Sequence, residues 1–209
     1  MKRIFLFAGR IHSGKNFAAE IAKNILTERG ASVETMMFAQ GVKDGCREDF
    51  KQLTDFLNSV AEDCAHDGDE YTAKLLYTED TNWYEKKTPL TRILLQTYGT
   101  EIFRNRVGKD WWTEKLAERV KESAADTILV TDMRFPNECD RLREMLPDCS
   151  VVSVLIERNV EDEEREAFAN HASETSLDGY EFDEVVDNNG TPDMLEEKLK
   201  SLLTKRGAK

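Results

Sequence analysis

The stretch that decides the fold is K-R-I-F-L-F-A-G-R-I-H-S-G-K-N, residues 2–16. Residues 2–8 form an apolar run with β-branched and aromatic side chains, which predicts a buried strand. Residues 17–26 carry apolar side chains at helical spacing. The intervening G-R-I-H-S-G-K-N fits the pattern G-x-x-x-x-G-K, so we expect a strand, a phosphate-binding loop and a helix in that order.

The residue types in this loop suit an anion. Gly9 and Gly14 allow backbone conformations and close approaches that a Cβ would block. The loop N–H groups and the helix N-terminus converge on an anion, and Lys15 adds a positive charge for the β- and γ-phosphates. Asn16 stands where Ser or Thr usually binds Mg²⁺, and its amide oxygen can ligate the ion or hold one of its waters. A glycine-containing turn that binds nothing is the alternative.

The rest of the chain predicts an α/β fold. We expect further strands, alternating with helices, at residues 32–39, 127–131, 150–156 and 182–186. The continuous apolar runs suit a parallel sheet that is covered on both faces. We therefore predict a single domain built on a five-stranded parallel sheet with helices on both faces. Its core comprises residues 1–39 and 125–209, and a helical region at 40–124 is inserted between the second and third strands.

The inserted region has weaker local signals. Thr88 and Pro89 predict the start of a helix that ends near Gly99, and Asp110 is the expected N-cap of a helix over 110–120. Residues 65–87 are rich in Asp, Glu, Thr and Tyr, and we expect an exposed insertion there.

The composition limits the function. The net charge of −12 argues against a surface that binds polymeric nucleic acid, and the apolar runs are too short to span a membrane. The four cysteines show no C-x-x-C pairing, so we expect neither a zinc site nor disulfides, and we expect a cytoplasmic protein. A homodimer is common in such folds and stays open.

Three further groups of residues could carry chemistry. Asp132 ends an apolar run, where a metal-binding carboxylate is expected in a phosphate-loop protein, and Arg134 follows as a phosphate ligand. The alternative for Asp132 is a helix cap. Arg92 and Gln96 share one helix face and could grip a phosphate and a base, or could simply be solvated.

The third group lies near the C-terminal end. His171 and Glu174 are three residues apart, which is also typical of an ordinary surface pair. Arg158 and Arg165 precede them and could neutralise charge during phosphoryl transfer, or could belong to a solvated helix.

Five motifs together resemble one family. They are G-R-I-H-S-G-K-N at 9–16, L-L-Q-T-Y-G-T-E at 94–101, D-M-R-F-P-N-E at 132–138, H-A-S-E at 171–174 and D-N-N-G-T at 187–191. In this order they are similar to the phage-type deoxynucleoside monophosphate kinases, which have a P-loop kinase fold. The resemblance implies an ATP- and Mg²⁺-dependent enzyme that transfers the γ-phosphoryl group to a deoxynucleoside monophosphate, a small-molecule substrate.

The same resemblance implies roles for individual residues. ATP and its metal would be held by Gly9, Ser13, Gly14, Lys15, Asn16, Asn188 and Gly190, with Asn16 and Asp132 as metal ligands. The catalytic residues would be Lys15, Asp132, Arg134, Arg158 and Arg165. The acceptor nucleotide would be bound by Lys43, Arg92, Gln96, Arg134, His171 and Glu174. Residues 40–124 would be the acceptor-binding region, and residues 158–180 would form a lid.

Two other functions stay open. One is another small-molecule P-loop kinase, of the dephospho-coenzyme-A type, which would share the ATP half. The other is a regulatory protein that binds ATP without transferring phosphate, a reading that Asn16 favours.

Overall fold

The computed structural model describes residues 1–49, 51–70, 89–159 and 171–208, which fall into two compact units. The first unit comprises Met1–Phe38 and Gly108–Lys209, and the second comprises Ala39–Val107.

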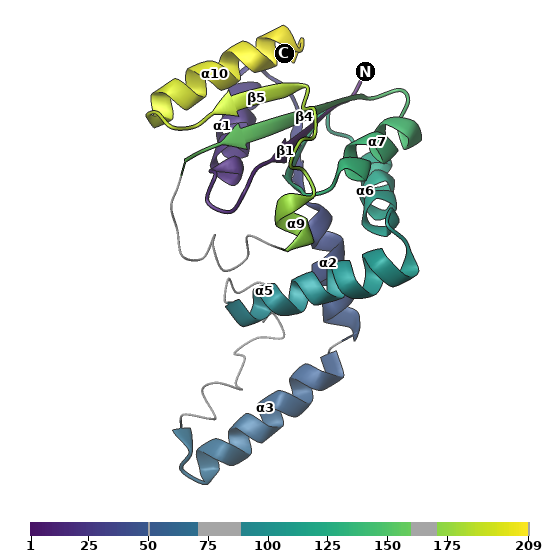
Figure 1. Ribbon diagram of the computed structural model, residues 1–209, viewed down its shortest axis with the longest axis vertical. Helices are drawn as coiled ribbons and strands as arrows, with labels where there is room; N and C mark the ends of the chain where they lie inside the picture. The colour runs from purple at the N-terminus through teal and green to yellow at the C-terminus, as the bar shows by residue number, and fades with distance from the viewer. Residues whose placement is uncertain (50, 71–88, 160–170, 209) are drawn as a thin grey trace. The chain divides into compact units, whose positions relative to one another are not determined.

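The first unit is built on one parallel sheet (Figure 1). Its strands are β1 (Arg3–Ala8), β2 (Val33–Met36), β3 (Thr127–Met133), β4 (Ser150–Glu157) and β5 (Glu184–Asp187). They lie in the order β2-β3-β1-β4-β5, and every neighbouring pair is parallel. The predicted five-stranded parallel sheet is therefore confirmed. The carboxyl ends of the strands share one edge, which is where open α/β sheets bind ligands.

Helices cover both faces of this sheet (Figure 1). One face packs against α1 (Lys15–Glu28) and α10 (Pro192–Lys205), and the other packs against α6 (Trp111–Glu122) and α7 (Pro136–Met145). Successive residues of β1 alternate between the two cores: Phe5 and Phe7 join the first, and Ile4, Leu6 and Ala8 join the second. All five are fully buried, as expected of a central parallel strand.

The second unit is helical. It contains α2 (Phe38–Asp49), whose first residue still belongs to the first unit, α3 (Lys51–His66), α5 (Pro89–Gln96) and a π-helix, η2 (Thr97–Val107). Two glycines allow α2 and η2 to pack closely. A Cβ on Gly45 would lie 2.6 Å from the hydroxyl of Tyr98, and a Cβ on Gly99 would lie 3.1 Å from a methyl group of Val42.

Several boundaries differ from the predictions. Strand β2 ends at Met36, because the chain enters α2 at Phe38. The α-helix α5 ends at Gln96, close to Gly99 as predicted, but the chain continues as the π-helix η2, in which Gly99 packs against Val42. The second unit ends at Val107 rather than at residue 124, because α6 packs on the sheet through Leu116, Ala117 and Val120.

Other predictions are only partly tested. Asp110 occupies the N-cap position of α6, but its side chain makes no capping hydrogen bond. Residues 71–88 lie outside the described residues, so most of the expected insertion at 65–87, and Thr88, are not described.

Two further findings concern membrane spans and the cysteines. Among the described residues, no helix combines the length and apolar character that a membrane span requires. Cys46, Cys64, Cys139 and Cys149 all lie in the described part of the chain, and none forms a disulfide.

Candidate active site

The predicted phosphate loop connects β1 to α1 at the carboxyl edge of the sheet. Its turn is closed by the Ser13 amide, which donates to the Arg10 carbonyl at 3.1 Å. The first backbone bond of α1 runs from the Ala18 amide to the Gly14 carbonyl at 2.9 Å, so the N–H groups of the first turn have no acceptor inside the helix. Lys15 extends its ammonium group to the Arg10 carbonyl at 3.4 Å. Backbone donors and a cation therefore gather at a helix N-terminus, which suits phosphate.

Both loop glycines have a backbone conformation that disfavours other residues. Gly9 has φ +151° and Gly14 has φ +86°. A Cβ on Gly9 would lie 2.6 Å from the Ile156 carbonyl oxygen, and a Cβ on Gly14 would strike the side-chain amide of Asn188. Glycine at these two positions therefore lets the loop pack closely against β4 and against the turn after β5. The close contacts that glycine permits here are with other segments of the protein.

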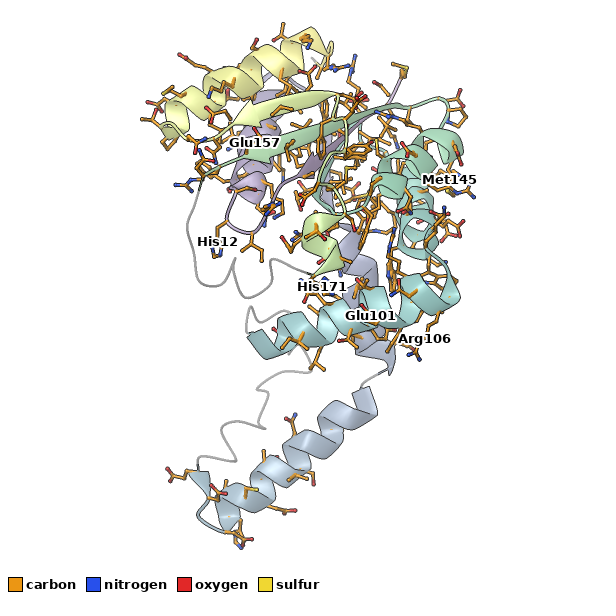
Figure 2. The ribbon with its side chains drawn as sticks, viewed as in Figure 1. His12, Glu101, Arg106, Met145, Glu157 and His171 are labelled. Carbon is orange, nitrogen blue, oxygen red and sulfur yellow. The ribbon has the colours of Figure 1, made fainter. Side chains whose placement is uncertain are left out.

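Two further residues show strain or unused polarity in this loop. His12, labelled in Figure 2, has φ +60°, which is uncommon for a residue with a side chain. The Ser13 hydroxyl is buried and has no hydrogen-bond partner among the described residues. A buried hydroxyl without a partner is costly, so its presence beside backbone donors fits a loop that receives a phosphate oxygen.

The short turn between β3 and α7 positions Arg134. The Glu138 carboxylate accepts the amides of Arg134 at 2.7 Å and Phe135 at 3.0 Å. Glu138 is 5% exposed and lies in the first turn of α7, which begins at Pro136. The motif D-M-R-F-P-N-E therefore builds a rigid corner that presents the Arg134 side chain.

The segment that contains H-A-S-E contacts both Arg134 and the phosphate loop. One oxygen of Glu174 accepts from Arg134 Nη1 at 2.5 Å, and the other accepts from the Ile11 amide at 3.3 Å. Four residues later, Asp178 pairs with Arg10, also in the loop, at 2.9 Å. Residues 174–178 are thus attached to the loop at two points.

These parts enclose a cavity of about 520 Å³. Among its lining residues are Gly9, Arg10 and Ser13 of the loop, Arg134, Glu157 and Arg158 at the end of β4, and Ser173, Glu174 and Asp178. Figure 2 shows Glu157 at the end of β4 and His171 at the start of α9 (Ala172–Thr175). Three arginines from three separate segments therefore line one cavity, together with the phosphate loop.

Part of the cavity wall is neutral. Leu177, Tyr180 and Phe182 also line it, and the rings of Tyr180 and Phe182 meet edge to face with centroids 4.9 Å apart. Burial raises the pKa of the Tyr180 phenol, and its hydrogen bond with Cys139 raises that pKa further. Tyr180 therefore stays a protonated hydroxyl at neutral pH.

The structure brings some predicted site residues together and leaves others outside the cavity lining. Gly9, Ser13, Arg134, Arg158 and Glu174 all line it. Lys15 and Asn16 lie in the first turn of α1, beside the loop.

Four predicted residues have other contacts. The Asp132 carboxylate accepts the amide of Phe38, the first residue of α2, at 2.9 Å, which is a capping contact. His171 is the N-cap of α9, where its Nδ1 accepts the Ser173 amide. Asn188 donates to the Ser13 carbonyl at 2.9 Å and thus supports the loop, and Gly190 packs beside Met194. Roles for these residues as ligands stay predictions.

The remaining predicted residues are not placed at this site. Lys43 lies on α2, and Arg92 and Gln96 lie on α5, all in the second unit. Arg165 lies outside the described residues, as does the part of the predicted lid at 160–170. Their expected roles stay predictions.

Arg10, Asp178 and Glu138 are among the site residues that were not singled out from the sequence. Arg10 and Asp178 form an ion pair between residues 168 positions apart, and no local pattern predicts such a pair. Glu138 could have been found, because it follows Phe135 and Pro136 at the spacing of a helix-capping residue.

A sequence model of the deoxynucleotide monophosphate kinase family matches residues 62–199. The chain belongs to the deoxynucleotide monophosphate kinase family. This confirms the resemblance that the motifs indicate. The matched span of this kinase family includes Arg92, Asp132, Arg134, Glu174 and Asn188.

A curated relative is similar over a shorter stretch. The deoxynucleoside-5'-monophosphate kinase of Escherichia phage T5 is 40% identical over 53 residues, which cover 25% of this chain and 21% of the relative. The aligned part thus spans about a fifth of that kinase.

Solved structures resemble the chain over nearly its whole length. A Cys556Ala mutant of the Mycobacterium tuberculosis APS kinase CysC has a TM-score of 0.48 at 12% identity, with 97% of each chain covered. The Deinococcus radiodurans tunicamycin resistance protein has a TM-score of 0.42 at 12% identity, with 99% of this chain and 96% of that chain covered. The fold of this member of the kinase family is therefore described from its own sheet, phosphate loop and helices, and not from these structures.

Proposed function

We propose that this protein transfers the γ-phosphoryl group of ATP to a deoxynucleoside monophosphate and forms the diphosphate. The observation that carries the proposal is a single cavity lined both by the phosphate loop and by Arg134 and Arg158. Family membership supports the class of acceptor.

The residues of the loop fit the phosphates of ATP. The unpartnered Ser13 hydroxyl and the first-turn amides of α1 would donate to phosphate oxygens, and Lys15 would contribute charge. ATP supplies the phosphoryl group that is transferred. Mg²⁺, for which Asn16 and Asp132 are the proposed ligands, would neutralise phosphate charge, and it commonly binds through one or two side chains together with phosphates and waters.

The chain's own contribution is positioning and charge. Phosphoryl transfer needs an attacking oxygen in line with the leaving group and cations around the transferred group. The acceptor phosphate supplies the attacking oxygen, so no protein nucleophile is required. Arg134 and Arg158 would stabilise the negative charge of the reacting phosphates.

The direct test measures ADP release. Purified protein with ATP and Mg²⁺ is assayed against each deoxynucleoside monophosphate, each ribonucleotide counterpart and dephospho-coenzyme A, with acceptor-free reactions as controls. We expect ADP with one or more deoxynucleotides and little without an acceptor. Turnover with dephospho-coenzyme A alone would favour the alternative kinase, and ATP binding without any turnover would favour a regulatory protein.

A substitution in the loop tests the ATP half separately. Lys15→Ala should lower kcat by at least about 100-fold, because it removes a charge that acts on the phosphates. Lys23→Ala removes an exposed lysine from the same helix and should leave kcat unchanged. Equal activity of the two variants would contradict the proposed role of the loop.

We also propose a cytoplasmic location and a small-molecule substrate, without polymeric nucleic acid or membrane as partners. The net charge of −12 and the absence of disulfides among the four cysteines support this part.

A further inference from the structure

The carboxylate of Glu174 joins two parts of the candidate active site. Its Oε1 accepts from Arg134 Nη1 at 2.5 Å, and its Oε2 accepts from the Ile11 backbone amide at 3.3 Å. Ile11 belongs to the phosphate loop, and Arg134 follows β3. One side chain therefore holds the loop and the arginine in fixed positions relative to each other.

This ion pair is not a solvated surface contact. The Glu174 side chain is only 6% exposed and the Arg134 side chain is 26% exposed. A buried carboxylate requires its cation, because removal of the cation leaves a charge without compensation. The geometry of Arg134 is thus coupled to the presence of Glu174.

The pair also constrains which part of the guanidinium is used. Within the described part of the chain, the Arg134 side chain bonds through Nη1 alone, to Glu174 and to the Ser173 carbonyl at 3.4 Å. The guanidinium is a rigid planar fork, so holding one nitrogen fixes the direction of the others. Because Arg134 lines the cavity, its remaining donors are suited to bind phosphate there.

We propose that Glu174 is a positioning residue, which orients Arg134 and anchors Ile11 of the phosphate loop, rather than a ligand of the acceptor as we expected from the sequence. This inference rests on the proposed function, since Arg134 is taken to act on the reacting phosphates. Misplacement of a catalytic group by about 1 Å can lower the rate by about 100-fold, so such a residue has a measurable effect without contact with substrate.

The chemistry of glutamine makes Glu174→Gln a specific probe. Both partners of Glu174 are donors, and two carboxylate oxygens accept from them. A glutamine keeps the size but has one acceptor oxygen, and its NH₂ group would face a donor. Only one of the two contacts can survive. Glu144→Gln is the matched control, because Glu144 also pairs with an arginine, Arg141, but is 67% exposed and lies outside the cavity lining.

The test is a double-mutant cycle of Glu174→Gln and Arg134→Ala, read by kcat, by both KM values and by thermal unfolding. Glu174→Gln should lower kcat by about 10- to 100-fold with both KM values within about threefold of wild type. In the Arg134→Ala background it should lower kcat no further, because the glutamine oxygen can then accept the Ile11 amide and keep the one contact that remains. In the same background Glu174→Gln should raise the melting temperature, because it removes the buried charge that Arg134→Ala leaves unpaired. Glu144→Gln should match wild type throughout.

Each other result has a defined meaning. Losses in kcat that multiply in the double variant, or a Glu174→Gln variant with wild-type kcat, overturn the positioning role. A raised KM for the acceptor with unchanged kcat overturns it in favour of an acceptor ligand. Absence of wild-type turnover with any acceptor overturns the proposed function and this inference with it, whereas wild-type turnover with independent losses overturns the inference alone.

Discussion

Two arginine–carboxylate pairs in the first unit have similar lengths but different surroundings. Arg134 and Glu174 meet at 2.5 Å, and Arg143 of α7 meets Asp183, just before β5, at 2.6 Å. Asp183 Oδ2 also accepts from the amide of Ser153 at 2.7 Å and from its hydroxyl at 2.8 Å. Neither Arg143 nor Asp183 lines the cavity, whereas Arg134 and Glu174 do.

The surroundings of the two pairs distinguish an ion pair that stabilises the fold from one that serves a site. The Asp183 network ties β4, α7 and the start of β5 together, and Arg143 also donates to the Val151 carbonyl at 3.4 Å. Its bonds run entirely between structural elements. The Arg134 pair instead holds an arginine at the wall of a cavity beside the phosphate loop. Distance alone would not distinguish the two pairs.

The largest expected effect separates the two arginines by activity. Arg134→Ala should lower kcat/KM by about 1,000-fold, because it removes a cation proposed to act on the reacting phosphates. Arg143→Ala should leave kcat/KM within about twofold of wild type and destabilise the fold by about 1 kcal/mol, since the pair is partly exposed. Steady-state kinetics and urea unfolding measure both. Comparable kinetic losses in the two variants would contradict the assignment of Arg134, and not Arg143, to the active site.

A second effect contrasts two glycines with positive φ. A Cβ on Gly9 would meet the Ile156 carbonyl oxygen at 2.6 Å, whereas a Cβ on Gly30, at the end of α1, would have nothing within 4 Å. Gly9→Ala should therefore destabilise by about 3 kcal/mol, combining strain with a steric clash, and lower kcat by at least about 10-fold. Gly30→Ala should cost about 1 kcal/mol and retain activity.

One result would contradict the expected difference between the two glycines. If Gly9→Ala behaved like Gly30→Ala in unfolding and kinetics, the close packing of the phosphate loop against β4 would have no energetic importance.

The smallest effect concerns pH. Burial acts to raise the pKa of Asp183, but the hydrogen bonds from Ser153 and the charges of Arg143 and Arg206 outweigh it and lower that pKa in the folded protein. The unfolded chain binds the proton more readily, so the ionised carboxylate stabilises the fold above the ordinary pKa of about 3.9. This contribution is lost as the pH falls through the lowered folded value.

The measurement compares wild type with Asp183→Asn by urea unfolding at several pH values. Wild type should be more stable by about 2 kcal/mol near pH 7, and the difference should shrink below about pH 4. A difference that grows on acidification would have the wrong sign for a carboxylate with a lowered pKa.

Much of the fold could be predicted from local patterns. Continuous apolar runs predicted three of the strands, β1, β3 and β4, because buried parallel strands are apolar on both faces. The phosphate loop followed from Gly9, Gly14 and Lys15 between a strand and a helix. The π-helix η2 that follows α5 was not predicted, because the residue that Gly99 packs against, Val42, is distant in sequence.

The sequence indicated which residues contribute to the site, but not which of them contact one another. Arg134 and Glu174 were candidates from their motifs, yet nothing in the sequence indicates that they bond to each other. Glu174 lies 163 residues from Ile11, and such pairings depend on the topology of the sheet. The structure thus changes the proposed role of Glu174 from ligand to positioning residue.

The most direct test of the central claim follows the phosphoryl group itself. ATP labelled in its γ-phosphate is incubated with Mg²⁺, a mixture of the four deoxynucleoside monophosphates and either wild type, Arg134→Ala or Arg143→Ala, and the products are separated by chromatography. We predict label in a deoxynucleoside diphosphate with wild type and Arg143→Ala, and almost none with Arg134→Ala. Label found only in inorganic phosphate, or equal transfer by Arg134→Ala and wild type, would contradict the account.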